Sequence, residues 1–92
     1  MLSKKITVIN PTGLHLRPAG LFASAAMKFK SSIILRHENK TIDAKSVINV
    51  MAAGIKKGTT VELTCDGEDE EKAMKTLTEL VESGLGELTT KY

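Results

Sequence analysis

The chain has 92 residues, of which thirteen are Lys or Arg and eleven are Asp or Glu, so its formal net charge is +2. Hydrophobic residues make up 41% and aromatic residues only 3%, which predicts one domain over residues 1–92 with an aliphatic core and argues against direct nucleic-acid binding by aromatic stacking. The single cysteine excludes an intramolecular disulfide and indicates a cytoplasmic location, and the lack of a run of ~20 apolar residues indicates no membrane insertion.

The first predicted element is a strand at about residues 4–9, where β-branched residues alternate between two faces. Asn10, Pro11 and Gly13 are typical of a turn and end this strand. The sequence therefore predicts a loop that leads directly to His15.

A helix is predicted from Leu16 to Phe29, because apolar residues recur there at helical spacing. Pro18 is tolerated only in the first turn of a helix, so either His15 or Arg17 is expected at the N-cap. The apolar face is expected to consist of Leu21, Phe22, Ala25, Ala26 and Phe29.

Two short strands are predicted near residues 32–37 and 40–43, joined by a tight turn that Asn39 favours. A short helix follows. Ser46 has the side chain of an N-cap residue, and Gly54 suits the left-handed position just after the helix.

Residues 60–65 alternate again and place Cys65 on the apolar face of another strand. The last helix follows a turn at Asp66 and Gly67, and its first turn is expected to hold the four acidic residues from Glu68 to Glu71. Negative charge is favourable at a helix N-terminus, so this acidic run is interpreted as helix stabilisation and not as a metal site.

The order of these elements is βαββαβα. Polar alternation in the strands predicts one sheet face toward solvent, with the three amphipathic helices on the other. The expected fold class is therefore α+β, an open-faced β-sandwich. Basic pairs follow the first two helices, Lys28 with Lys30 and Lys56 with Lys57, and they are interpreted as helix-dipole complements and solubilising charges in preference to a polyanion site.

The position of His15 at a helix start has chemical consequences. Backbone N–H groups are exposed there, and those of Leu16, Arg17 and Ala19 are expected to be available, whereas Pro18 has none. Together with the Arg17 guanidinium, they favour a phosphate. The same positive environment is expected to keep the His15 imidazole neutral, and a neutral ring nitrogen is a nucleophile. The pattern predicts phosphoryl acceptance on His15.

Motifs for nucleotide binding are absent from the sequence. There is no G-x-x-x-x-G-K-[ST] segment, no G-x-G-x-x-G segment after a strand, and no carboxylate close to His15 in sequence that could hold magnesium. No cofactor or metal is therefore predicted. The phosphoryl group is expected to arrive from another protein.

Two segments, "GLHLRPAG" and "KSVINVMAAG", resemble the signature segments of HPr, the histidine-containing phosphocarrier family of the bacterial phosphoenolpyruvate-dependent sugar phosphotransferase system. The resemblance covers nearly the whole chain. It implies that His15 accepts a phosphoryl group from phosphorylated enzyme I and donates it to sugar-specific IIA proteins, with Arg17 stabilising the phosphohistidine. It also implies a four-stranded antiparallel sheet backed by three helices, and a monomeric phosphoryl carrier in place of a stand-alone enzyme.

The same resemblance suggests regulation and a docking surface. Ser46 matches a serine that an ATP-dependent kinase modifies in many such proteins from Gram-positive bacteria, which would add an HPr kinase/phosphorylase and a catabolite-control transcription regulator to the partners. An N-cap role for Ser46 is compatible with this. The apolar docking surface around the histidine is matched by Leu21, Val47, Ile48 and Met51, some of which are expected to belong to the core.

Local departures from the family pattern bear on partner choice. Leu16 stands where alanine is common after the histidine, and Gly20 stands where Thr, Ser or Ala is frequent. One alternative function is a nitrogen-type or purely regulatory phosphorelay without sugar uptake. Another is a non-catalytic ferredoxin-like interaction domain in which His15 only caps the helix. His37 matches no functional position.

Overall fold

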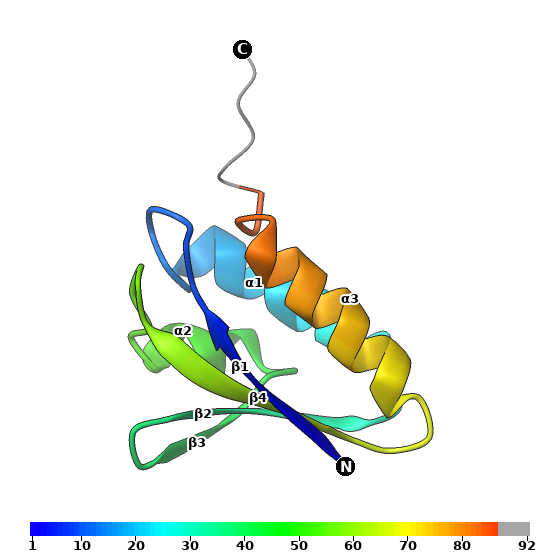
Figure 1. Ribbon diagram of the computed structural model, residues 1–92. Coiled ribbons are helices and arrows are strands. Elements are labelled where there is room, and N and C mark those ends of the chain that lie inside the picture. The colour runs from blue at the N-terminus through cyan, green and yellow to red at the C-terminus, as the bar shows by residue number, and fades with distance from the viewer. Residues whose placement is uncertain (87–92) are drawn as a thin grey trace.

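The structure is a computed structural model, which describes residues 1–86. Its elements confirm the predicted order βαββαβα, and the three helices lie on one side of the sheet (Figure 1). None of the helices in this part of the chain is long and apolar enough to cross a bilayer. The elements are β1 (Leu2–Thr7), α1 (Leu16–Ala26), β2 (Ser32–His37), β3 (Lys40–Asp43), α2 (Val47–Ala52), β4 (Thr60–Asp66) and α3 (Glu70–Glu82).

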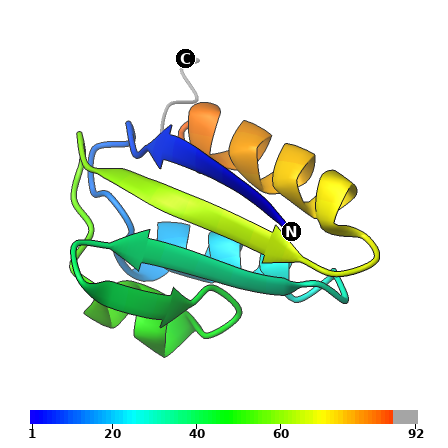
Figure 2. The same ribbon diagram turned by 60° about the horizontal axis from the view of Figure 1, so that its bottom comes forward.

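The four strands form one sheet in the order β1-β4-β2-β3, and all neighbouring pairs are antiparallel. Figure 2 shows the sheet with the helices behind it. Strand β4 demonstrates why one face is buried: Val61, Leu63 and Cys65 are almost inaccessible, whereas the residues between them are partly exposed. The open-faced α+β sandwich predicted from the sequence is therefore confirmed.

The core is aliphatic, with Phe22 of α1 as its one fully buried aromatic side chain among the described residues. Leu21 was expected on the buried face of this helix, but its side chain is 41% exposed. The buried face of α1 is formed by Phe22 and by three residues that helical geometry places on the same side, Ala19, Ala23 and Ala26. Small alanines let α1 lie close to its neighbours.

Element boundaries differ from the predictions at two places. The first strand is Leu2–Thr7 and not residues 4–9, because Val8 leaves the regular ladder although its N–H still donates to the Thr59 carbonyl at 2.9 Å. Helix α1 ends at Ala26, and the chain turns through residues 27–29. The β2–β3 hairpin matches its predicted bounds, but the residue with positive φ in its turn is Glu38, at 57°, and not Asn39.

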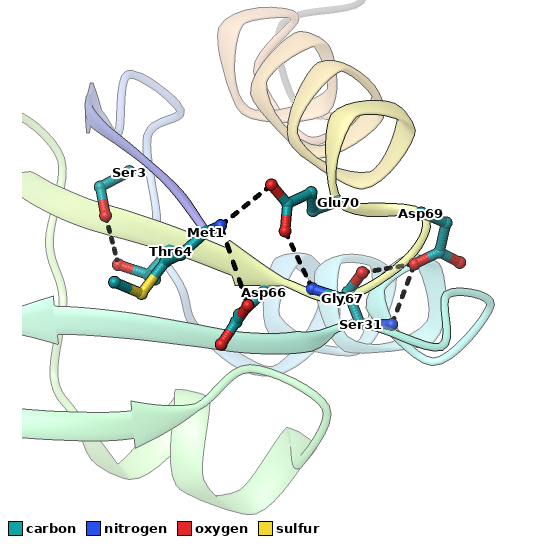
Figure 3. A network of polar contacts seen from close by, with 8 residues as sticks. All are labelled: Met1, Ser3, Ser31, Thr64, Asp66, Gly67, Asp69 and Glu70. Carbon is teal, nitrogen blue, oxygen red and sulfur yellow. Dashed lines mark hydrogen bonds and ion pairs between the residues drawn. The ribbon is translucent and has the colours of Figure 1, made fainter.

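The acidic run from Glu68 to Glu71 is divided between the first turn of α3 and the segment before it, so the prediction that all four residues lie in the first helical turn was wrong. Only Glu70 and Glu71 are in that turn. Asp69 is the N-cap residue, but its carboxylate accepts hydrogen bonds from the Ser31 N–H at 2.9 Å and the Ser31 hydroxyl (Figure 3). It also accepts one from the Lys30 N–H at 2.8 Å. These donors, the Ser31 hydroxyl first, lower the pKa of Asp69 to about 2.

Candidate functional site

His15 is the N-cap residue of α1, which resolves the choice between His15 and Arg17. Its backbone is extended, with φ −83° and ψ −167°, and its carbonyl accepts the first intrahelical hydrogen bond from the Ala19 N–H at 2.7 Å. The side chain makes no capping hydrogen bond, and the residue is exposed. The imidazole is therefore free of a local structural task and open to a partner.

Two backbone N–H groups stand at this helix start without an acceptor among residues 1–86, those of Leu16 and Arg17. The expectation that the Ala19 N–H is also available was wrong, since it is used by the His15 carbonyl. Two N–H donors at the positive end of an eleven-residue helix make an anion-binding arrangement next to His15, and Arg17, in the same helical turn, is exposed.

The loop that carries His15 is held in place by the loop between α2 and β4. The Leu14 N–H donates to the Ile55 carbonyl at 2.9 Å, and the side chains of both residues are buried. Further back, the Gly58 N–H donates to the Val8 carbonyl at 2.7 Å. These bonds fix the approach of the chain to α1.

Gly13 is essential to this contact for two reasons. Its φ of +66° is in the left-handed region that disfavours side chains. In addition, a Cβ on Gly13 would come within 2.7 Å of the Lys56 Cα and would also strike the Ile55 carbonyl oxygen. A glycine is therefore required two residues before His15.

Ser46 is the N-cap of α2, as predicted. Its Oγ accepts a hydrogen bond from the Asn49 N–H at 3.2 Å, and its own N–H donates to the Asp43 carbonyl at 3.1 Å. The residue is half-buried. The neighbouring Lys45 ties the start of α2 to the turn that follows α1, because its Nζ donates to the Phe29 carbonyl at 2.7 Å.

The four predicted docking residues differ in exposure. Ile48 is 74% exposed and Leu21 is 41% exposed, so both are surface side chains. Val47 and Met51 are half-buried and pack partly against the core. Leu16, the residue after His15, is 63% exposed and adds a large apolar side chain to this surface.

The sequence reasoning missed two features of the site. The tight packing of Gly13 on the α2–β4 loop depends on contacts between distant segments and has no local signal. Lys56 was noticed, but as a solubilising charge, whereas its backbone lies against the histidine loop. Within residues 1–86, no group of three His, Cys, Asp or Glu residues is arranged to hold a metal ion.

Comparison with known proteins supports a single family. A family model described as the PTS HPr component phosphorylation site matches residues 2–83. The phosphocarrier protein HPr of Neisseria meningitidis is 38% identical over 95% of this chain and 98% of its own length. The HPr-like protein Crh of Halalkalibacterium halodurans is 38% identical over 89% of this chain and 98% of its own. The crystal structure of HPr-C-His from Thermoanaerobacter tengcongensis has 45% identity and a TM-score of 0.91, covering 95% of this chain and 98% of that one.

Proposed function

Because the chain belongs to the HPr family of phosphocarrier proteins, we propose that His15 accepts a phosphoryl group from phosphorylated enzyme I and passes it to sugar-specific IIA proteins. The observation that carries this proposal is the exposed imidazole at the start of α1, beside two N–H groups without acceptors and the Arg17 guanidinium. The exposed imidazole can act as the nucleophile, and the donors at the helix start can stabilise the negative charge of the phosphohistidine that forms.

The proposed transfer is a displacement at phosphorus. A neutral ring nitrogen of His15 attacks the phosphoryl group, its new N–P bond forms, and the bond between phosphorus and the donor group of enzyme I breaks. The electron pair of the broken bond stays with the donor group, which takes up the proton that the phosphorylated imidazole releases. The Leu16 and Arg17 N–H groups and the Arg17 guanidinium then face the phosphoryl oxygens and stabilise their negative charge. Transfer of the phosphoryl group to a IIA protein reverses this displacement and regenerates free His15.

Labelling with radioactive phosphoenolpyruvate and catalytic enzyme I tests this proposal. The expected result is stoichiometric, acid-labile label on the wild-type protein, which moves to a IIA protein when one is added. Label that forms but is transferred to none of a panel of IIA proteins would favour the regulatory phosphorelay over sugar uptake. No label at all would contradict the phosphocarrier assignment and restore the ferredoxin-like interaction domain.

We also propose that phosphorylation of Ser46 by an HPr kinase/phosphorylase regulates the protein and favours binding to a catabolite-control transcription regulator. Ser46 Oγ stands at the N-cap of α2, next to Val47 and Ile48. A phosphate there meets the positive end of the helix, so the fold is expected to tolerate it. Its nearly two negative charges beside an apolar docking surface oppose the desolvation that docking requires.

The variant Ser46→Asp tests this regulation, with Ser32→Asp on the open face of the sheet as the charge-matched control. We expect Ser46→Asp to raise the apparent KM for enzyme I while its melting temperature stays near that of wild type. Ser32→Asp is expected to behave like wild type. Equal KM values for both variants would leave Ser46 as a helix cap only.

A further inference from the structure

The two ends of the molecule differ in charge. At the end away from His15, acidic residues from Asp66 to Glu71 surround the start of α3, and all three ion pairs recorded within residues 1–86 lie there. They join the Met1 amino group to Asp66 and Glu70, and Lys30 to Glu68 (the Met1 pairs in Figure 3). Positive charge at that end is therefore largely offset.

At the His15 end the positive charges have no such partners. Arg17, Lys56 and Lys57 are exposed, and none of them forms an ion pair with another residue of the described part of the chain. This end thus carries three exposed cationic side chains without an ion-pair partner in the described part of the chain.

Lys56 is held beside the histidine loop by its backbone and not by its side chain. Its Cα lies so close to Gly13 that a Cβ on that glycine would be 2.7 Å away, and the preceding residue, Ile55, accepts the Leu14 N–H. Figures 1 and 2 both show these two loops side by side at the end where α1 begins. The Lys56 side chain is therefore anchored at the rim of the site while its ammonium group stays free.

From this geometry we infer that Lys56 is a specificity-determining residue, which attracts the phosphorylated donor protein to His15 through opposite charge. The inference rests on the proposed function, since it requires a donor that carries a phosphoryl group of about −2 charge. A positive charge at the rim of the site is expected to raise the rate of association a few-fold at low ionic strength, and salt screens the effect. Lys56 is expected to act on association and not on the transferred phosphoryl group.

The test compares phosphorylation kinetics with enzyme I for wild type, Lys56→Gln, Lys56→Arg and Lys72→Gln. Lys72 is an exposed lysine in the first turn of α3, so its variant removes the same charge at the opposite end. We expect Lys56→Gln to raise KM about threefold at low salt with unchanged kcat, and to match wild type in 0.5 M salt. Lys56→Arg and Lys72→Gln are expected to match wild type throughout.

Equal KM values for Lys56→Gln and Lys72→Gln at low salt would overturn the inference. The proposed function would still stand in that case, provided that the wild-type protein accepts label from enzyme I. A lowered kcat with unchanged KM would also overturn it, because Lys56 would then act on the transferred group. Failure of wild type to accept label in the same series would instead refute the proposed function. Thermal melts check that all variants are equally stable. This is expected for Lys56→Gln, because the Lys56 side chain is exposed and makes no recorded hydrogen bond or ion pair with the described residues.

Discussion

Replacing Gly13 by alanine tests how the histidine loop is held, and Gly54→Ala supplies a matched control. The two glycines have almost the same φ, +66° and +68°, but a Cβ on Gly54 meets nothing within 4 Å. The left-handed conformation costs an L-residue about 1–2 kcal/mol at either site. At Gly13 the added Cβ also clashes with the backbone of Ile55 and Lys56, which adds about 2 kcal/mol, as is typical of overpacking in a closely packed region.

We therefore expect Gly13→Ala to lower the free energy of unfolding by about 3–4 kcal/mol and Gly54→Ala by about 1–2 kcal/mol. Alanine also restricts the unfolded chain more than glycine does, which raises the free energy of unfolding. Both variants share this contribution, so it cancels in the comparison. In urea titrations the difference appears as a lower midpoint with unchanged slope, and in thermal melts as a further fall of roughly 10 °C. Equal destabilisation of the two variants would refute the claim that the α2–β4 loop clamps the histidine loop.

Three further predictions concern single side chains. Arg17→Ala is expected to slow phosphoryl acceptance more than Arg17→Lys, because lysine keeps the charge but not the planar fork, and equal rates would argue against a direct phosphate contact. Since hydrogen bonds lower the pKa of Asp69 to about 2, that carboxylate contributes stability above pH 3.8 that is lost as the pH falls toward 2, and urea titrations of Asp69→Asn between pH 5 and 2 should show a weaker pH dependence than wild type. Burial raises the pKa of Cys65 to about 11, so its alkylation at pH 8 should be slow and should accelerate as urea unfolds the protein; alkylation of the native protein at the rate of a free thiol would contradict this burial.

Local patterns in the sequence account for much of the fold. The hairpin strands match their predicted bounds, and Ser46 caps α2 as its side chain suggests, because both features depend on neighbouring residues. Asp69 shows where local reasoning fails. The Asp69 carboxylate was expected to stabilise the start of its own helix. It instead accepts hydrogen bonds from the N–H and hydroxyl groups of Ser31, which is distant in sequence.

The same limit applies to the candidate site. Pro18 and the helical spacing after it were enough to place His15 and Arg17 at a helix start, because proline restricts the first turn. The use of the Ala19 N–H and the exposure of Leu21 depended on where α1 begins and how it is rotated against the core. The position of Lys56 beside Gly13 is a contact between two distant loops, which periodicity does not encode.

The most direct test of the central claim is to locate the phosphoryl group that enzyme I transfers. Wild type, His15→Ala and His37→Ala are incubated with radioactive phosphoenolpyruvate and enzyme I, and acid-labile label is measured on each. His37, at the end of β2, is the only other histidine of the chain and serves as the control. The account predicts full label on wild type and His37→Ala, and none on His15→Ala, with all three proteins folded. Acid-labile label on His15→Ala would contradict it.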